Sequence, residues 1–570
     1  MKRSLNSKYG WIWLLLLLAV INIVASIFHF RLDMTAERRY TLSKPTRNLL
    51  SQLEEPVMIT IFLSGDMPAG FKKLANSSEE LLQEFKEVGK NEIQFKFEKP
   101  GEGLSDTLKT IFIDSLHRLG LTPMNVKAQT KEGEGQEERF IYPGALVSYK
   151  GRVSAVDFLQ GQSMVNGINS LNNAEALLEY KFASAIHKVI QDTVPLIGYL
   201  TGNGESLLYN VYDLINSVKA NYNFRILPID NVATIPSVFS AMLIVKPTER
   251  FSDQQKLKID QYIMNGGKVM WMIDNLYAEF DSLQRSQNEF IAFDRGLNLE
   301  DQLFKYGVRI NLNLVQDLNA DEVPSVIGNV GGKPQIELIP WPYFPLLSNI
   351  TGHPIAKNLD YVVSQFPNTI DTVKAAGIKK TSLLVTSNSS RILSSPARVT
   401  WQSVQNAEDE RTYNKANIAV AILLEGKFSS LFNNRISAAM RNSLLAHNQP
   451  FLSMNRADNK MIVIADGDIA LNAVSQKEGP LPMGKNMYTG SQYANKEFIF
   501  NCIEYLTDNS NILEARAKDY TLRLLDKKKV EEEKMKWQFF NIALPVVLIV
   551  LFSAFYQYVR KRRYEVWVSY

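Results

Sequence analysis

Two apolar runs at opposite ends of a mainly polar chain dominate its hydrophobic pattern. The first covers Trp11–Phe30 and the second covers Trp537–Val559. A helix rises 1.5 Å per residue, so about twenty apolar residues cross a hydrocarbon core of roughly 30 Å. We therefore predict a transmembrane helix at each end, short tails at residues 1–10 and 560–570, and a large body between the two helices.

The first run is longer than the apolar core of a usual signal peptide, and no small-residue cleavage site follows Phe30. We therefore favour an uncleaved anchor over a cleaved signal, which would leave one span. Aromatic and basic residues close to the ends of spans anchor them at the membrane interfaces. The expected anchors are Trp11, Trp13, Trp537, Tyr556, Tyr558, Arg560, Lys561, Arg562 and Arg563. The basic group after the second run favours both tails in the cytoplasm and the body outside.

Residues 31–191 have the alternation of an N-terminal α/β domain. The run Val57–Leu63 is β-branched and apolar, which predicts a buried strand. An amphipathic helix is expected over Ser77–Val88, a strand over Ile93–Glu98 and a hairpin over residues 140–158. A long helix is then predicted over Asn172–Gln191.

A second α/β domain is predicted over residues 192–510. Buried strands are expected at Val194–Leu200, Ala241–Lys246 and Lys268–Asp274, with a helix at Ser252–Asn265 between the last two. Strands that alternate with helices predict an open parallel sheet covered by helices on both faces. Residues 281–460 are less regular, and the prolines from Pro340 to Pro354 predict irregular structure. A charged helical stalk is expected over residues 511–536.

Composition excludes some functions. The formal net charge is +4 over 570 residues and the basic residues are dispersed, so the pattern of a nucleic-acid-binding face is missing. Cys502 is the single cysteine, which excludes an intramolecular disulfide and a cysteine-based zinc site.

The loop TGNGE, formed by Thr201, Gly202, Asn203, Gly204 and Glu205, follows a predicted strand and is expected to open a helix. Open α/β sheets bind ligands at the carboxyl ends of their strands, and helix N-termini offer amide donors. The loop is therefore a candidate site for a ligand or partner. The alternative interpretation is a tight turn that needs glycine for its backbone conformation.

Asp466 and Asp468 follow another predicted strand and could chelate a hard cation. The remaining oxygen ligands of a calcium-binding loop are missing around them. A polar turn is the favoured interpretation, and we predict no metal site and no cofactor.

Enzymatic motifs are also missing. Gly331-Gly332-Lys333 lacks the first glycine and the hydroxyl residue of a phosphate-binding loop, and no G-x-S-x-G nucleophile elbow occurs. Cys502 falls on the apolar face of a predicted helix. We therefore expect no catalytic residues and no enzyme.

Several segments together resemble one family. The segment RLDMTAERRYTLSKPTRNLL, the loop TGNGE, the segment FSDQQKLKIDQYIMNGGKVMWMIDN and the late ADGDIALN are similar to the GldG family of gliding-motility-associated ABC-transporter auxiliary proteins of Bacteroidetes-type bacteria. The middle region also resembles the sheet of class I glutamine amidotransferases, a flavodoxin-like fold found in intraflagellar-transport proteins. Asn203 stands where the resemblance leads us to expect histidine, which argues against a chemically active loop.

The resemblance implies a GldF-like ABC permease and a cytoplasmic GldA-like ATPase as partners, with a homodimer within the complex as one arrangement. It also implies an inner-membrane protein with cytoplasmic termini and a periplasmic body. The leading hypothesis is a non-catalytic accessory subunit that couples this body to the permease. One alternative is a tethered binding module for a polymer such as a glycan, with Trp341, Tyr343 and Phe344 as candidate contacts. A remote alternative is a hydrolase of amidotransferase-like fold. The transported substrate and the copy number do not follow from the sequence.

Overall fold

The computed structural model confirms the mixed α/β class. It describes residues 15–20, 22, 41–90, 92–121, 123–129, 136–159, 167–191, 193–285, 289–330, 332–401, 410–447, 449–508, 510–517 and 527–564. The chain forms two compact units, Met1–Asp519 and Tyr520–Tyr570.

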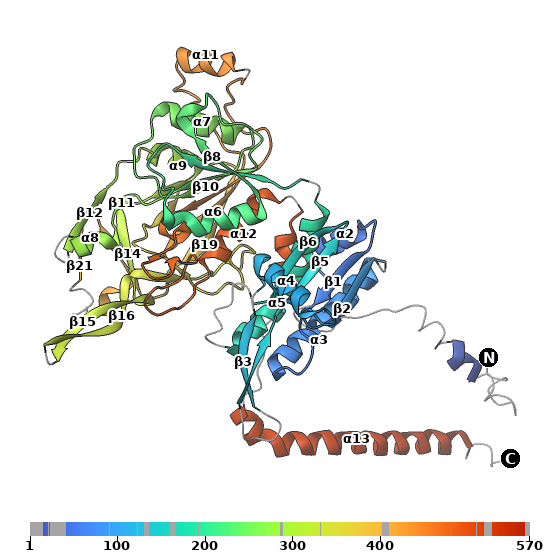
Figure 1. The fold of residues 1–570 in the computed structure, drawn as a ribbon. Coiled ribbons are helices and arrows are strands. Elements are labelled where there is room, and N and C mark those ends of the chain that lie inside the picture. Colours follow the sequence, from blue (N-terminus) through green and yellow to red (C-terminus); the bar gives the residue numbers. More distant parts are fainter. Residues whose placement is uncertain are drawn as a thin grey trace. The chain divides into compact units, whose positions relative to one another are not determined.

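The N-terminal part contains a four-stranded sheet in the order β2-β1-β5-β6 (Figure 1). Its strands are β1 (Val57–Ile61), β2 (Ile93–Phe97), β5 (Gly144–Tyr149) and β6 (Arg152–Asp157). β1 and β2 run parallel, whereas β5 pairs with β1 and β6 in antiparallel fashion. The strands and the hairpin predicted here are confirmed.

Helices and one further hairpin surround this sheet. They are α2 (Lys44–Ser51), α3 (Ala69–Val88), α4 (Asp106–Arg118), β3 (Met124–Gln129) and β4 (Gln136–Ile141). Helix α3 begins at Ala69 rather than at the predicted Ser77. Gly70 in its first turn and the polar Asn76-Ser77-Ser78 segment, which are weak helix formers, conceal its true start.

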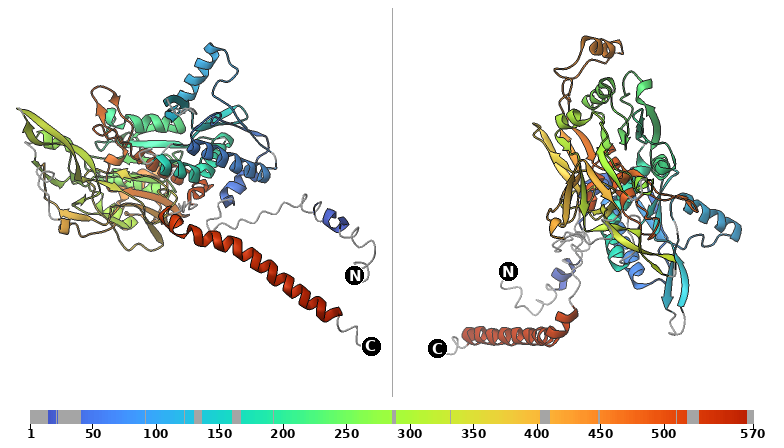
Figure 2. Two further views of the ribbon diagram at one scale, coloured as in Figure 1. Left: turned by 90° about the horizontal axis from the view of Figure 1, so that it is seen from below. Right: turned by 90° about the vertical axis from the view of Figure 1, so that its left-hand side faces the viewer.

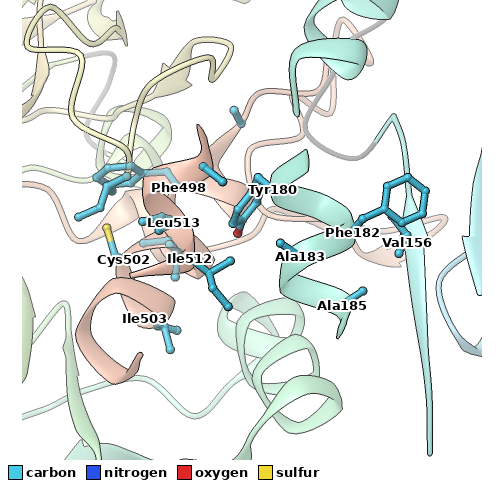
Figure 3. Close-up of a cluster of buried hydrophobic side chains, with 14 of the residues drawn as sticks. Val156, Tyr180, Phe182, Ala183, Ala185, Phe498, Cys502, Ile503, Ile512 and Leu513 are labelled. Atoms are coloured by element: carbon cyan, nitrogen blue, oxygen red, sulfur yellow. The ribbon is translucent and has the colours of Figure 1, made fainter. Parts of the chain in front are cut away.

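Helix α5 (Gly167–Ile190) joins the N-terminal sheet to the rest of the body. Ala174, Leu178, Phe182 and Ile186 on it are buried, and so is Tyr180 between them. Figure 3 shows the Phe182 ring directed toward Val156 of β6 and the Tyr180 ring directed toward the side on which Phe498 and Leu513 lie. A helix that is apolar on more than one side is buried between layers, and α5 therefore belongs to both layers.

A seven-stranded sheet follows, in the order β19-β22-β23-β10-β9-β7-β8. Its strands are β7 (Leu196–Thr201), β8 (Asn223–Pro228), β9 (Ala241–Val245), β10 (Val269–Met272), β19 (Ile378–Val385), β22 (Ala419–Gly426) and β23 (Asn459–Ile464). The five strands from β23 to β8 run parallel, and β22 and β19 extend the sheet with antiparallel pairing. The sheet is therefore mixed rather than wholly parallel.

Helices cover both faces of this sheet. Successive strand residues point to opposite faces, and in these strands both sets of side chains are apolar, so both faces need a cover. Leu243 and Val245 pack in one core with helices α6 (Tyr212–Asn221) and α12 (Asn495–Thr507). Met242 and Ile244 pack in another core with helices α7 (Asp253–Met264) and α9 (Glu300–Tyr306). Short 3₁₀ segments complete the layer: η1 (Tyr209–Val211), η2 (Ile229–Asn231), η4 (Asp468–Ala470) and η5 (Ile512–Ala517).

Apart from α9 and β19, residues 276 to 400 form small sheets, and part of this segment encloses a third core. They comprise β11 (Leu276–Tyr277), α8 (Phe280–Arg285), β12 (Glu289–Asp294), β13 (Val308–Ile310), β14 (Asn313–Asp317), β15 (Ala320–Val330), β16 (Lys333–Leu347), β17 (Val362–Val363), β18 (Ile370–Thr372), β20 (Ser390–Ser394) and β21 (Ala397–Thr400). The later short elements are η3 (Glu410–Thr412), α11 (Ala438–Ala446), β24 (Val474–Ser475) and β25 (Gly479–Pro480). β15 and β16 form a long hairpin that projects from its surroundings (Figures 1 and 2).

The prediction of irregular structure around the prolines is wrong for β16, which contains Pro334, Pro340, Pro342 and Pro345. Its residues Lys333–Pro340 and Pro345 pair with β15, and Leu346 and Leu347 pair with β17. On the side away from β15, the carbonyls of Tyr343 and Pro345 accept the amide hydrogens of Phe366 and Ser364. A proline lacks the amide donor and is tolerated where the strand has an unpaired edge. The proline pattern therefore indicates an edge rather than a break.

Among the described residues of the C-terminal unit there is one helix, α13 (Lys527–Tyr564), which contains Pro545. Within α13, Glu533–Arg562 is the one segment among the described residues that is long and apolar enough to cross a membrane. The predicted anchors Trp537, Tyr556 and Tyr558 are exposed on α13, and its last turns contain Arg560 to Arg563.

Of the first predicted span, only residues 15–20 and 22 are described, and they are helical. Trp11, Trp13 and the tail at residues 1–10 lie outside the described residues.

Candidate functional site

The carboxyl ends of four adjacent parallel strands bring most of the predicted site residues to one edge of the central sheet. The order β23-β10-β9-β7 places four connecting loops side by side. Asp466 and Asp468 follow β23, Asp274 follows β10, and Lys246 follows β9. The loop Thr201–Glu205 begins at the end of β7. Such an edge is where open α/β sheets place ligands.

Lys246 is the centre of a buried charge cluster. Its Nζ lies 2.6 and 2.7 Å from the two carboxylate oxygens of Asp468. The same atom lies 3.2 Å from Asp274 Oδ2 and 3.0 Å from Glu279 Oε2. Glu279 also accepts a hydrogen bond of 2.5 Å from Arg295. One ammonium group therefore contacts three carboxylates. We call Lys246, Asp274, Glu279 and Asp468 together the Lys246 cluster.

The backbone around the Lys246 cluster is shaped to bring these groups together. Lys246 has a positive φ of 45°, a conformation that costs a residue with a side chain about 1–3 kcal/mol. Gly467 packs directly against it, because a Cβ on Gly467 would lie 2.6 Å from the Cβ of Lys246. Asp274 Oδ1 accepts the amide hydrogen of Gly467 at 2.5 Å, which ties the β10 loop to the β23 loop.

Asp466 is fully buried and orients the loop rather than the lysine. One of its oxygens accepts hydrogen bonds from the Ser364 hydroxyl and from the Gln365 amide, the latter at 2.8 Å. Its other oxygen accepts the amide hydrogen of Asp468 at 2.7 Å. Asp466 thus fixes the backbone of Asp468. It also connects the sheet edge to the segment after β17.

Burial shifts the protonation of this cluster. It raises the pKa of Asp466 well above its usual range. It also raises the pKa of Asp468 to about 7, although Lys246 acts in the opposite direction. Burial by itself would lower the pKa of Lys246, but Asp468, Asp274 and Glu279 outweigh it and raise that pKa. Lys246 therefore stays charged throughout the physiological range.

The cluster has oxygen donors that a hard cation prefers. Oxygens of Asp274, Asp466 and Asp468 lie within 4.8 Å of one another. The ammonium of Lys246 contacts two of these carboxylates, so it supplies the positive charge that a metal ion would otherwise bring. Among the described residues, this arrangement fits an internal ion network better than a metal centre.

The TGNGE loop is built as a tight turn. Gly202 and Gly204 have φ values of +130° and +80°, and a Cβ on Gly204 would lie 2.0 Å from Thr248 Oγ1. Asn203 is buried, and its carbonyl accepts the amide hydrogens of Thr248 and Glu249, both at 2.9 Å. The side-chain nitrogen Nδ2 of Asn203 donates a hydrogen bond to Gln255 Oε1 at 3.1 Å. The loop is therefore pinned to the segment that follows Lys246.

Glu205 does not begin a helix, because η1 starts at Tyr209 and α6 at Tyr212. Its Oε2 instead accepts the amide hydrogen of Asn203 at 2.8 Å, and burial raises its pKa. Within the described part of the chain, no hydrogen bond or ion pair joins this loop directly to the Lys246 cluster. The expected helix N-terminus beside the glycines is thus missing.

Sequence reasoning missed Lys246, Asp274, Glu279 and Arg295 as members of the site. A usable signal existed, because the wholly apolar strands AMLIV and VMWM lead into Lys246 and Asp274. A charged residue at the end of a buried parallel strand is placed at the ligand-binding edge. Nothing in the local sequence pattern marks Glu279 or Arg295.

The aromatic candidates for polymer binding are buried instead. Trp341, Tyr343 and Phe344 form a cluster with Phe366 and Phe280, and the Trp341 and Phe344 ring centres are 4.8 Å apart. The exposed fractions are 0% for Trp341, 2% for Tyr343 and 6% for Phe344, so these rings offer no platform to a glycan.

Comparisons with known proteins identify the region that contains the site. Residues 195–502, from β7 to α12, match the family model described as "ABC-type uncharacterized transport system", the auxiliary component of such systems. This match covers more than half of the chain. The chain belongs to this ABC-transport auxiliary family. The family supports an accessory role in an ABC-type transport system, and with α13 it indicates association with a membrane.

Other similarities are less specific. Residues 36–148 match a domain of unknown function. An uncharacterized protein of Borreliella burgdorferi is 24% identical over 360 residues, which cover 61% of this auxiliary protein and 63% of the relative. The solved structure described as "mmIFT52 N-terminal domain" matches with a TM-score of 0.29 and 13% identity, over 55% of this chain and 97% of that one.

Proposed function

We propose that this protein is a non-catalytic accessory subunit of an ABC-type complex, and that it couples an extracytoplasmic body to the permease through its two terminal membrane segments. The observation that carries the proposal is that both ends of the body meet on the same helix, α5. A subunit that only delivered solute would need at most one tether.

The N-terminal end of the body is attached to α5 by a partly buried hydrogen bond. The amide of Ser43 donates to Glu179 Oε1 at 2.7 Å, directly before α2 begins at Lys44. Leu49 and Leu50 of α2 are buried in the same core as Leu178 and Phe182 of α5. Residue 43 lies only a short segment after the first predicted span.

The C-terminal end of the body is attached to the same helix. Ile512, Leu513 and Ala515 of η5 are buried in the core that contains α5. The Arg516 guanidinium lies 5.0 Å from the ring centre of Tyr180. The first residues of the expected charged stalk are therefore packed against the body, and α13 begins at Lys527. These contacts support the proposal that α5 responds to both membrane segments.

Further details extend the resemblance given above. We propose a polytopic permease and a P-loop ATPase of the GldF and GldA kinds as partners, and a role in gliding motility. The basic residues Arg560, Lys561 and Arg562 at the end of α13 support a cytoplasmic C-terminus in the inner membrane and a periplasmic body. Membrane lipid at this basic end is a further expected contact.

An amidotransferase-like fold without amidotransferase chemistry is part of the proposal. Five parallel strands with helices on both faces support the fold, by analogy of architecture only. Cys502 lies inside α12 and is fully buried, so its thiol is not at a strand-to-helix elbow. The Lys246 cluster holds its charges among its own groups, which supports a structural or partner-binding edge.

Co-purification tests the assembly. The tagged full-length chain is extracted from its native membrane in mild detergent, and its companions are identified by mass spectrometry. A permease and a P-loop ATPase in stable ratio would support the proposal. Isolation of the chain alone, or with envelope polymer only, would contradict it.

Cleavage tests the coupling. A protease site inserted between Lys527 and Lys536 separates the body from the second span, and the same insertion in the β15–β16 turn is the matched control. Cleavage at the first position should abolish transporter-dependent function, whereas cleavage at the second should not. Intact function after the first cut would refute coupling even if the complex still assembles.

A further inference from the structure

We infer that a cavity beside α5 binds a small organic anion that carries hydroxyl groups, of the kind represented by sugar phosphates and sugar acids. The inference goes beyond the proposed function, because binding here does not depend on the permease. The cavity has a volume of about 560 Å³ and is lined by residues of β6, α5, α6, α12 and η5. Sites for small metabolites typically have this size and lie where domains meet.

Arg516 is a buried cation in this cavity that has no direct ion pair with any described residue. Its side chain is 4% exposed. Its guanidinium donates to Asn501 Oδ1 at 2.8 Å and to the carbonyl of Lys357 at 3.3 Å, which are both neutral oxygens. Its Nε has no hydrogen-bond partner, and no carboxylate within ion-pair distance occurs among the described residues. The Tyr180 ring and, through electrostatic attraction, the Glu497 carboxylate compensate this charge only in part. A buried cation without a direct ion pair is costly and favours an anionic ligand.

The rest of the cavity lining also contains more cationic than anionic side chains. The cationic side chains around the cavity are Arg118, Lys181, Lys188, Lys496 and Arg516. Three carboxylates accompany them: Asp157, Glu497 and Glu504. Arg118 and Lys188 are exposed at the rim, where positive charge raises the local concentration of anions. Of the inner cations, Lys496 pairs with Asp213 at 3.0 Å and burial lowers the pKa of Lys181 to about 8. The positive charge available to a ligand is therefore that of the rim and of Arg516.

The carboxylates explain why the ligand should also carry hydroxyl groups. Glu504 accepts hydrogen bonds from the Tyr180 hydroxyl at 2.5 Å and the Ser184 hydroxyl at 3.2 Å, so it already behaves as an acceptor for neutral donors. Burial raises the pKa of Glu497, which lies on the same face of α12. The stacked rings of Tyr222 and Phe500 complete one wall. Sugar rings suit such a mixture of acceptors and aromatic faces.

Isothermal titration calorimetry on the full-length protein in nanodiscs tests the inference. The probes are D-glucose 6-phosphate, D-gluconate and neutral D-glucose, at constant ionic strength and against empty nanodiscs. We expect saturable binding of at least one charged probe with a dissociation constant below about 1 mM and none of glucose. The charged probe that binds distinguishes a phosphate ligand from a carboxylate ligand. No saturable heat from either anion, or equal binding of glucose, would overturn the inference.

Two variants locate the binding. Ala220 is an exposed residue of α6 on the cavity wall, and Ala220→Trp should fill the entrance and weaken binding at least about tenfold. Ala439→Trp on exposed α11 is the matched control and should leave affinity unchanged. Arg516→Gln should abolish binding of the anion while a thermal transition shows that the protein is folded. Equal affinities in the Ala220→Trp and Ala439→Trp proteins would place the anion elsewhere and refute this site.

Discussion

Removal of the ammonium at the centre of the Lys246 cluster tests how the sheet edge is stabilised. In Lys246→Met, the side chain keeps its length but leaves Asp468 and Asp274 without their cation. The side chains of Lys246, Asp274 and Asp468 are only 9%, 7% and 13% exposed, so solvent screens them little. Loss of one partner of a buried ion pair costs about 3–5 kcal/mol. Glu279 retains Arg295, so its contribution to the loss is small.

The loss should depend on pH in a defined direction. Burial raises the pKa of Asp468 to about 7, above its unfolded value, and the lysine opposes this shift. A carboxyl group with a raised folded-state pKa stabilises the fold most at pH below its unfolded pKa, and this contribution declines as the pH rises toward 7. Without Lys246 that pKa rises further. The destabilisation should therefore be largest at pH 8 and smaller at pH 5, where Asp468 is protonated.

Urea-dependent proteolysis of the full-length protein measures the change in unfolding free energy at both pH values. Arg309→Met, which breaks an exposed ion pair with Asp371, is the control and should cost at most about 1 kcal/mol. Adding Asp468→Asn to Lys246→Met should recover part of the loss, because the two residues are coupled. A loss no larger than that of Arg309→Met, or one equal at pH 5 and pH 8, would refute the reasoning.

Three further substitutions have direct readouts. Gly204→Ala places a Cβ 2.0 Å from Thr248 Oγ1 at a φ of +80°, so it should lower the urea midpoint by more than Gly296→Ala, where φ is also positive but no atom lies within 4 Å. Cys502→Ala should lower the unfolding free energy by about 1 kcal/mol and leave transport-dependent phenotypes unchanged. In the wild-type protein, the buried Cys502 thiol, whose pKa is raised by burial, should react with maleimide only after unfolding. Trp341→Ala should cost about 3–5 kcal/mol in the same unfolding assay, and a stable variant that lost glycan binding would instead support a surface role.

Local sequence patterns predicted much of the fold, because runs of apolar residues and helix starts can be recognised within a few consecutive residues. The apolar runs at Val57–Ile61, Ala241–Val245 and Val269–Met272 became buried strands, and the helix predicted from Ser252 is present with Ser252 as its N-cap. The antiparallel edge strand β19 and the hairpin with β16 were harder to predict. Their register depends on partners elsewhere in the chain rather than on their own periodicity.

The site was harder to predict for the same reason. Lys246 and Asp468 are separated by 222 positions, and only the sheet order brings them together. The sequence indicates Asp466 and Asp468 as one candidate pair, but Asp466 orients the loop whereas Asp468 forms the ion pair with Lys246. Arg516 lies in the segment predicted as a charged helical stalk, and only the packing of η5 against α5 makes it a buried cation.

The position of α5 between two layers also determines when this protein can finish folding during synthesis. Tyr180 on α5 bonds to Glu504 of α12, 324 positions later. Ribosomes add about 5–20 residues per second, so roughly 16 to 65 s pass between the synthesis of Tyr180 and that of Glu504. Meanwhile the apolar side that will meet α12 and η5 is open to aggregation or to a chaperone. A chain that stops before Asn495 therefore yields an incompletely closed α5 rather than a smaller working body.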